Sequence, residues 1–175
     1  GLVGDILDLA SIEAGLLELQ IERVDLHHCL TDILGLISER ARHKKLKLNF
    51  DCPIDIGWIN VDEKNFKQCL LHLLSNAISF SSSGGSITMT AARDNEGVHI
   101  DIQDTGIGIP KIDIERVFTG FERGVEADSH KPGAGLGLTL VKAFIELHNG
   151  TVSITSKPNQ GTTVSFFLPD TRDAD

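Results

Sequence analysis

The chain has 175 residues, of which 41% are hydrophobic and 23% are charged, and its formal net charge is −9. This length is enough for one domain with a full core, and the acidic excess disfavours nucleic acid or an anionic membrane as partner. No apolar run approaches the roughly 20 residues of a membrane span, and no signal peptide is visible. Cys29, Cys52 and Cys69 are odd in number and lack metal-ligand spacing, which favours buried, reduced thiols. We therefore expect a cytoplasmic domain, and leave open whether a full-length parent is attached to the inner membrane.

Apolar residues at helical spacing predict a helix over residues 2–14 that stops at Gly15. This pattern is already under way at the first residue, so we expect the chain to be a segment of a longer protein. Alternating apolar residues then predict a strand over residues 17–21.

The next helix begins after Asp25, a candidate N-cap. Its apolar face consists of Leu26, Cys29, Leu30, Ile33, Leu34 and Ile37. Short extended segments are expected at 46–50 and at 58–61. Asp62 is then the candidate N-cap of a helix over residues 63–79.

This third helix carries a polar stripe beside its apolar face. The stripe is formed by Gln68, His72, Asn76 and Ser79, which are spaced i, i+4, i+8 and i+11. Such a stripe either faces water or lines a binding site, and the helix alone does not distinguish these alternatives.

Two strands over 86–93 and 98–103 are predicted to form a hairpin that ends directly on Asp104. One or two helical turns follow at 111–118, and residues 119–132 lack periodicity and are expected to form a mobile loop. A last helix is expected from near Leu136 to residues 149–150, followed by strands at 152–155 and 163–168. The sum is an α/β (α+β) two-layer sandwich, with three longer helices packed on a mixed, mostly antiparallel sheet.

Asp104 begins a glycine-rich segment that contains Gly106 and Gly108. A carboxylate only accepts hydrogen bonds, and adenine offers an exocyclic amine where guanine has a carbonyl, so a buried Asp could select adenine. Glycines here would let the backbone approach the base or the ribose closely. The alternative is that Asp104 only caps a turn.

A second glycine cluster, with Gly133, Gly135 and Gly137, opens the last helix. Backbone N–H groups at a helix N-terminus bind phosphates, although a flexible loop feeding a helix would have the same composition. Asn76 could give a neutral oxygen to Mg²⁺ whose other ligands are phosphates and waters. Arg123, in the expected loop, could close over the terminal phosphates, or could be a solvated surface residue.

At these residues the chain resembles the ATP-binding domain of bacterial sensor histidine kinases, which share a Bergerat-type fold with DNA gyrase and the Hsp90 chaperones. The resemblance covers nearly the whole chain. Its motifs are the end of a dimerisation helix at 5–15, an N box at 71–77, a first glycine box at 104–110, an F box at 118–123, a second glycine box at 133–138 and a closing strand at 161–169. It implies residues 1–15 as the end of the dimerisation and phosphoacceptor helix, 16–170 as the ATP-binding domain and 171–175 as a tail.

The resemblance also implies roles for individual residues. Asn76 would hold Mg²⁺, Asp104 would read adenine, and Arg123 with the backbone around Leu136 would steady the γ-phosphate. His72 could act as a base or could simply pack. The complete set implied for ATP is Asn76, Asp104, Gly106, Gly108, Arg123, Gly133, Gly135, Leu136, Gly137, Leu138 and Thr162.

Several positions depart from the family pattern. His72 stands where Asn is usual, Ser79 and Gly120 stand where cations are common, and Ala134 replaces a usual Thr. Each lost cation would remove contacts worth roughly 1.5–3 kcal/mol, so we expect weakened ATP binding or turnover. Divergent members of the family have a changed phosphoacceptor, and this chain shares features with them.

The implied activity is transfer of the ATP γ-phosphate to a histidine on the preceding dimerisation domain. His27 and His28 lack the phosphoacceptor motif, so the acceptor is expected upstream of residue 1. The implied partners are the chain's own dimerisation domain, a second copy of the full-length protein, and a response regulator or partner kinase. Two alternatives are a pseudokinase that regulates a partner kinase through protein contacts, and a gyrase-like ATPase, which the missing Glu near position 72 disfavours.

Overall fold

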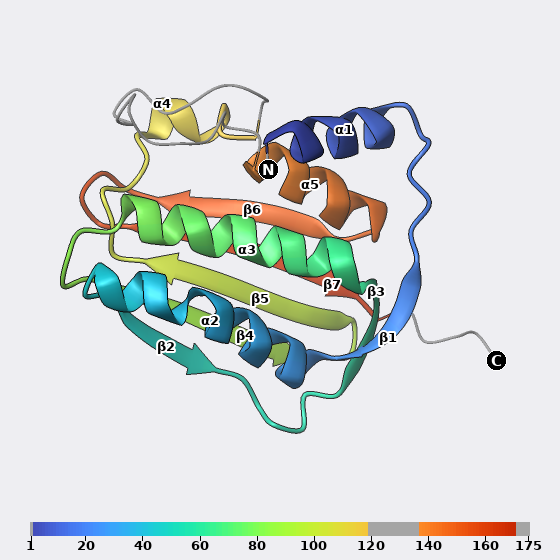
Figure 1. The fold of residues 1–175 in the computed structure, drawn as a ribbon, viewed down its shortest axis with the longest axis horizontal. Coiled ribbons are helices and arrows are strands. Elements are labelled where there is room, and N and C mark those ends of the chain that lie inside the picture. Colours follow the sequence, from blue (N-terminus) through green and yellow to red (C-terminus); the bar gives the residue numbers. More distant parts are fainter. Residues whose placement is uncertain (1, 119–136, 171–175) are drawn as a thin grey trace.

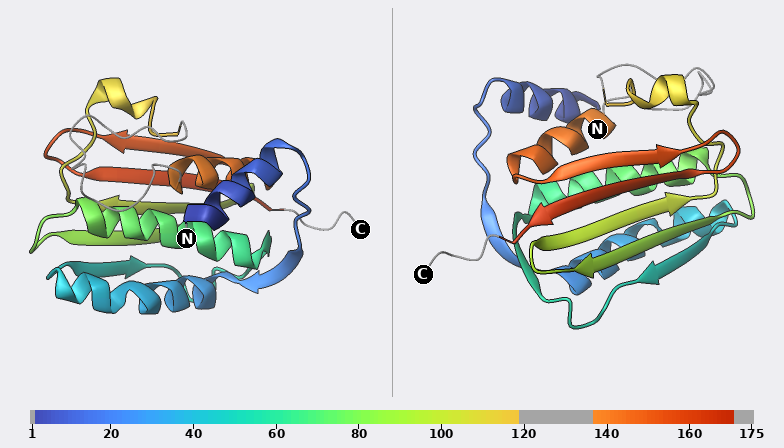
Figure 2. Two further views of the ribbon diagram at one scale, coloured as in Figure 1. Left: turned by 45° about the horizontal axis from the view of Figure 1, so that its top comes forward. Right: turned by 180° about the vertical axis from the view of Figure 1, so that it is seen from behind.

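The computed structural model describes residues 2–118 and 137–170. A five-stranded sheet of order β2-β4-β5-β7-β6 carries helices α2, α3 and α5 on one face, as Figure 1 shows. The β2–β4 pair is parallel and the other three pairs are antiparallel. Seen from behind, the opposite face of this sheet is not covered by any of the described helices (Figure 2). The predicted two-layer sandwich is therefore confirmed.

The helices and strands follow the predicted order closely. The helices are α1 (Leu2–Glu13), α2 (Leu26–His43), α3 (Glu63–Phe80), α4 (Lys111–Ile114) and α5 (Gly137–Leu147). The strands are β1 (Ile21–Asp25), β2 (Lys47–Asp51), β3 (Trp58–Asp62), β4 (Ser86–Arg93), β5 (Gly97–Asp104), β6 (Thr151–Ser156) and β7 (Thr162–Pro169).

Both long helices begin at the predicted caps. The carboxylate of Asp25 accepts a hydrogen bond from the backbone N–H of His28 at 3.0 Å, and that of Asp62 accepts one from Asn65 N–H at 3.1 Å. Such contacts satisfy backbone donors that have no partner inside the helix. The caps therefore fix where α2 and α3 start above the sheet.

The strand predicted over 17–21 is wrong in position, because β1 begins only at Ile21. It pairs antiparallel with β3, from Ile21 opposite Asp62 to Asp25 opposite Trp58. β3 ends at Asp62, where α3 begins, so residues 17–20 have no β3 residue left to pair with. Instead the backbone N–H of Gln20 donates to the Asp62 carboxylate at 3.0 Å.

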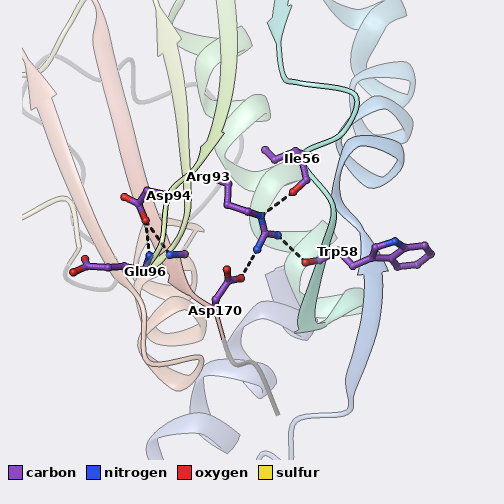
Figure 3. A network of polar contacts seen from close by, with 7 residues as sticks. Ile56, Trp58, Arg93, Asp94, Glu96 and Asp170 are labelled. Carbon is purple, nitrogen blue, oxygen red and sulfur yellow. Dashed lines mark hydrogen bonds and ion pairs between the residues drawn. The ribbon is translucent and has the colours of Figure 1, made fainter. Parts of the chain in front are cut away.

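Two side chains tie distant segments to this framework. His148, just after α5, accepts the Asp62 backbone N–H at its Nε2 (3.1 Å) and has its Nδ1 2.8 Å from the Phe144 carbonyl. Arg93, at the end of β4, donates to the carbonyls of Ile56 (2.8 Å) and Trp58 (2.7 Å) and pairs with Asp170 (Figure 3). Because these contacts join segments far apart in the chain, they hold the end of the molecule opposite the first glycine box.

The cysteine expectation is correct for two of the three thiols. Cys29 and Cys69 are buried in the core, whereas Cys52 is only half-buried after β2. Cys52 follows the end of β2 at Asp51, and the nearby Ile54 is 84% exposed. Among the helices that the structure describes, none is both long and apolar enough to cross a membrane.

Candidate nucleotide site

Four residues on adjacent strands lie in one row across the sheet, beneath the C-terminal end of α3. We call them the Asp104 row: Ile87, Asp104, Thr162 and Ser156. Strand register places Ile87 opposite Asp104, Asp104 opposite Thr162, and Thr162 opposite Ser156. Directly paired residues project from the same face of a sheet, and Ile87 is buried under the helices. Asp104, Thr162 and Ser156 therefore share the helix-covered face at the end of the sheet where β5 and α3 both end (Figure 1).

Asp104 is a buried carboxylate, 8% exposed, with its two oxygens in different situations. Oδ1 accepts hydrogen bonds from the backbone N–H of Gly106 at 2.8 Å and of Thr162 at 3.3 Å. Within residues 2–118 and 137–170, nothing donates a hydrogen bond to Oδ2. Burial raises the pKa of this carboxyl, and the two backbone hydrogen bonds oppose that rise. One oxygen thus holds the turn, and the other remains available to a ligand that can donate.

The glycines of the first glycine box are required by packing inside the protein. A Cβ on Gly106 would collide with the carbonyl of Phe80, the last residue of α3. Gly108 has φ +72°, and a Cβ there would collide with the carbonyl of Lys157. The segment after Asp104 therefore lies directly against α3 and the β6–β7 turn, and a nucleotide is not needed to explain these glycines. Their contact with a nucleotide stays a prediction.

The polar stripe of α3 has two different environments. Gln68 donates from Nε2 to Asp5 Oδ1 at 3.1 Å and to Asp8 Oδ2 at 3.4 Å, both on α1. His72 Nε2 lies 3.4 Å from Asp5 Oδ1. The first half of the stripe therefore faces α1, which lies beside α5 (Figure 2), and the alternative that it faces water is wrong there.

Asn76, one turn further along α3 from His72, is half-buried. Its carboxamide makes no hydrogen bond with another residue in the described part of the chain. At the end of the helix, the ammonium group of Lys44 donates to the carbonyls of Ile78 (2.6 Å) and Ser79 (3.0 Å). Lys44 thus caps α3, so this cation near position 79 is engaged by the helix terminus.

The start of α5 lies against His72. A Cβ built on Gly137 would be 3.4 Å from His72 Nδ1, and Leu138 packs against the core. The structure therefore brings His72 and Gly137 together and supports the packing alternative for His72. Four predicted site residues lie outside the described residues: Arg123, Gly133, Gly135 and Leu136. The same holds for the loop expected at 119–132, for Gly120 and for Ala134.

Ser156 belongs to this site but was not among the predicted residues. Its Oγ contacts Ile109, Gly161 and Thr162 at 2.8–2.9 Å. A signal for it exists in the sequence, because the period of two along β6 puts Ser156 on the same face as the partly buried Val152 and Ile154. A polar side chain on an otherwise apolar, partly buried strand face needs a hydrogen-bond partner. The glycine-containing turn that follows is where such a partner would be expected.

Comparison with known protein families matches residues 61–172 to the family described as histidine kinase-, DNA gyrase B- and HSP90-like ATPase. The chain belongs to this ATPase family. The matched region contains Asn76, Asp104 and Thr162, so the described part of the site lies wholly within the ATPase domain.

Individual relatives agree with this assignment. The chain is 43% identical over 174 residues to the "Non-motile and phage-resistance protein" of Caulobacter vibrioides, covering 96% of this chain and 20% of that protein. It is 36% identical to the sensor protein DivL of the same organism, covering 97% and 22% respectively. The chain therefore spans about a fifth of the length of these relatives.

Among solved structures, full-length ShkA in complex with AMPPNP is similar at a TM-score of 0.83 and 30% identity, over 99% of this chain and 36% of that chain. A histidine kinase ThkA structure in complex with the response regulator TrrA shares the fold at a TM-score of 0.77 and 21% identity, over 99% of this chain and 49% of that chain. Both likenesses extend across α1 as well as the ATPase domain, because nearly the whole chain is covered.

Proposed function

We propose that this ATPase-family chain binds ATP at the Asp104 row and is the kinase domain of a sensor histidine kinase. The observation that carries the proposal is the unequal hydrogen bonding of the two Asp104 carboxylate oxygens. Oδ1 accepts hydrogen bonds from two backbone N–H groups, whereas Oδ2 lacks a donor among the described residues. A carboxylate oxygen can only accept a hydrogen bond, and the amino group of adenine could donate one to Oδ2. The AMPPNP complex of the relative ShkA supports an adenine nucleotide as the ligand.

The reaction proposed is transfer of the ATP γ-phosphate to a histidine on a dimerisation domain that precedes this chain. Asp104 selects and orients the base, Thr162 and Gly106 hold Asp104, and Asn76 faces the phosphate side. Arg123 and the backbone at 133–138 are proposed to bind the phosphates. Positioning and electrostatic stabilisation account for most of such a transfer.

Mg²⁺ fits the residues that are present. No cluster of three His, Cys, Asp or Glu side chains that could hold a metal exists in the ranges 2–118 and 137–170. Asn76 offers one neutral oxygen without a hydrogen bond to other described residues, which suits an ion bound mainly by phosphates and waters. When bound, Mg²⁺ would neutralise the phosphate charge, and Asn76 would fix its place relative to α3.

The proposed partners follow from the relatives. We propose that the chain acts with its own dimerisation domain in a homodimer and passes phosphate to a response regulator, as the complex of ThkA with TrrA suggests. The contact of α1 with Gln68 and His72 supports residues 1–15 as the end of the helix that leads from that domain.

A second candidate is a pseudokinase that binds nucleotide weakly and regulates a partner kinase through protein contacts. Ser79 supplies no cation for phosphates, and Lys44 beside it is engaged by the carbonyls of α3. His72, in the N box, contacts Asp5 and the start of α5. These observations favour weakened turnover but leave the adenine site intact.

The test of nucleotide binding uses ADP with Mg²⁺ in calorimetric titrations of the unchanged chain, Asp104→Asn and Asp101→Asn. Asp101 lies on the same strand with its side chain on the opposite face, so it controls for loss of charge. We expect Asp104→Asn to weaken ADP binding about tenfold or more and Asp101→Asn to leave it unchanged. Equal effects of the two substitutions, or no binding by the unchanged chain, would contradict the proposal.

Kinase activity is tested on the full-length parent protein with γ-labelled ATP. Acid-labile label on the protein supports histidine phosphorylation. Retained ADP binding without any label would instead support the pseudokinase candidate.

A further inference from the structure

Ser156 lies at the centre of a hydrogen-bonded cluster that joins three segments of the site. The backbone N–H of Ile109, which follows the first glycine box, donates to Ser156 Oγ at 2.8 Å. Ser156 Oγ is 2.9 Å from the Gly161 carbonyl and 2.8 Å from Thr162 Oγ1. One hydroxyl therefore contacts the exit of the glycine box, the β6–β7 turn and the residue paired with Asp104.

The direction of each hydrogen bond in this cluster follows from counting protons. A backbone N–H can only donate and a carbonyl can only accept, whereas a serine hydroxyl has one proton and two lone pairs. For all three contacts to be hydrogen bonds, the Ser156 proton must go to the Gly161 carbonyl. The remaining lone pair of Ser156 then accepts from the Thr162 hydroxyl, because the other lone pair already accepts from Ile109.

This arrangement uses the single proton of the Thr162 hydroxyl. Thr162 Oγ1 is left with lone pairs only. Thr162 is the strand partner of Asp104, so both side chains project from the same face of the sheet. The Asp104 carboxylate likewise presents only lone pairs at Oδ2. Two neighbouring groups of the site therefore accept and do not donate.

We propose that Ser156 is a positioning residue that fixes the Thr162 hydroxyl as an acceptor and thereby sharpens the selection of a 6-amino purine over a 6-oxo purine. A 6-amino group donates to such a pair, whereas a 6-oxo group has no proton to offer and leaves it unpaired. Without the Ser156 hydroxyl, the Thr162 O–H is no longer engaged with Ser156 and can turn to donate to a 6-oxo group. This inference rests on the proposed nucleotide-binding function and deepens it.

The experiment compares ADP with inosine diphosphate, which has a 6-oxo group in place of the 6-amino group. Dissociation constants are measured with Mg²⁺ for the unchanged chain and for Ser156→Ala, Ser156→Thr and Thr162→Val. Ser153→Ala is the matched control, because Ser153 is on the same strand with its side chain on the opposite, exposed face. The double variant of Ser156→Ala with Thr162→Val tests whether the two residues act together.

We expect Ser156→Ala to lower the preference for ADP over inosine diphosphate by about five- to tenfold, the size of one hydrogen bond. Ser156→Thr retains the hydroxyl and should restore the preference, and Ser153→Ala should not change it. In the Thr162→Val background, adding Ser156→Ala should leave the preference unchanged, since no hydroxyl remains to be oriented.

If Ser156 had a purely structural role, Ser156→Ala would weaken the binding of ADP and of inosine diphosphate equally. It would do so both in the unchanged chain and in the Thr162→Val variant. An unchanged preference in Ser156→Ala, with ADP binding retained, would overturn this inference and leave the proposed function standing. If Ser156→Ala fails to fold, the preference for ADP over inosine diphosphate in Ser156→Thr and Thr162→Val tests the inference instead. The same preference in Thr162→Val as in the unchanged chain would overturn it. Failure of the unchanged chain to bind ADP would overturn the proposed function itself.

Discussion

Asp5 of α1 and His72 of α3 face each other with Oδ1 and Nε2 3.4 Å apart, and the same Oδ1 accepts a hydrogen bond from Gln68. Both side chains are largely covered, at 15% exposed for Asp5 and 24% for His72. His72 Nε2 makes no hydrogen bond with a described residue, so one carboxylate oxygen lies close to two residues of the N-box helix and bonds one of them. This pairing couples the position of α1 to the stripe that continues to Asn76.

Asp5→Asn should therefore loosen α1 more than Asp8→Asn, because within the described residues the Asp8 carboxylate accepts a single, longer hydrogen bond from Gln68, at 3.4 Å. Weakening the Gln68 hydrogen bond to Asp5 is worth about 1 kcal/mol, which corresponds to roughly fivefold faster opening of α1. Hydrogen exchange of the α1 backbone amides measures the effect. Equal protection of α1 in the two variants would show that the Asp5 contacts do not hold the helix.

His148 is predicted to be a stability determinant, although it lies at the end of α5 and away from the Asp104 row. Replacing it by Ala leaves the Asp62 N–H without its acceptor at the start of α3, which costs about 1–3 kcal/mol of unfolding free energy. His43→Ala is the control, since His43 is 73% exposed and lies 3.6 Å from Glu39. Urea unfolding should show a clear loss for the first variant and almost none for the second.

The sequence predicted the layers of the fold because its local signals agree with one another. Asp25 and Asp62 cap the helices they were expected to cap, and apolar periodicity locates the core. The strand expected at 17–21 failed because its extent depends on where β3 ends, which is information from a distant segment. Alternation alone cannot reveal a missing partner strand.

Two residues of the site were predictable from the sequence. Asp104 stands where a predicted strand ends on a glycine-rich segment, and Asn76 belongs to the polar stripe of a predicted helix. The cluster around Ser156 was not predictable, because it depends on strand register that pairs Ser156 with Thr162 and Thr162 with Asp104. The role of Gly108 likewise depends on the approach of Lys157 from another turn. Contacts between residues roughly fifty positions apart require the assembled sheet.

Asp104 should make stability depend on pH in a direction opposite to that of a salt-bridged carboxylate. Burial raises its pKa in the folded state, so the folded protein binds this proton more tightly than the unfolded chain does. Its contribution to stability is therefore greatest below the ordinary Asp pKa of about 3.9 and is lost as the pH rises through the raised value.

The comparison that isolates this effect is wild type against Asp104→Asn, with Asp101→Asn as the control. Unfolding free energies are measured with urea between about pH 3.5 and pH 7. The unfolding free energy of wild type should fall relative to that of Asp104→Asn as the pH increases. A difference that is constant with pH would contradict the burial of the charge.

The three thiols should differ in reactivity. Burial raises the pKa of Cys29 to about 11 and raises that of Cys69 further, whereas Cys52 is half-buried and has a more modestly raised pKa. Because the thiolate is the reactive form, iodoacetamide at about pH 8 should label Cys52 first. Peptide mass mapping in native buffer and in denaturant measures this order, and early labelling of Cys69 would show that the α3 core opens readily.

Arg93 is a partly exposed residue at the end of the molecule opposite the site, and we expect its substitution to lower the unfolding free energy strongly. Its guanidinium group joins Ile56, Trp58 and Asp170 (Figure 3), and so ties the segment before β3 to the end of β7. Lys carries the same charge but lacks the planar fork that reaches three acceptors at once. Arg93→Lys should therefore cost about 2 kcal/mol of unfolding free energy, and Arg93→Ala somewhat more.

Arg42→Lys is the matched control, because Arg42 is 77% exposed and only 3.8 Å from Glu39, in a pair worth little in water. Asp170→Asn should reproduce only part of the Arg93 effect, since the carbonyls of Ile56 and Trp58 remain bonded. Chemical unfolding monitored by Trp58 fluorescence reports directly on this region. If Arg93→Lys matched Arg42→Lys in stability, charge alone would explain the contact and the three-way geometry would not matter.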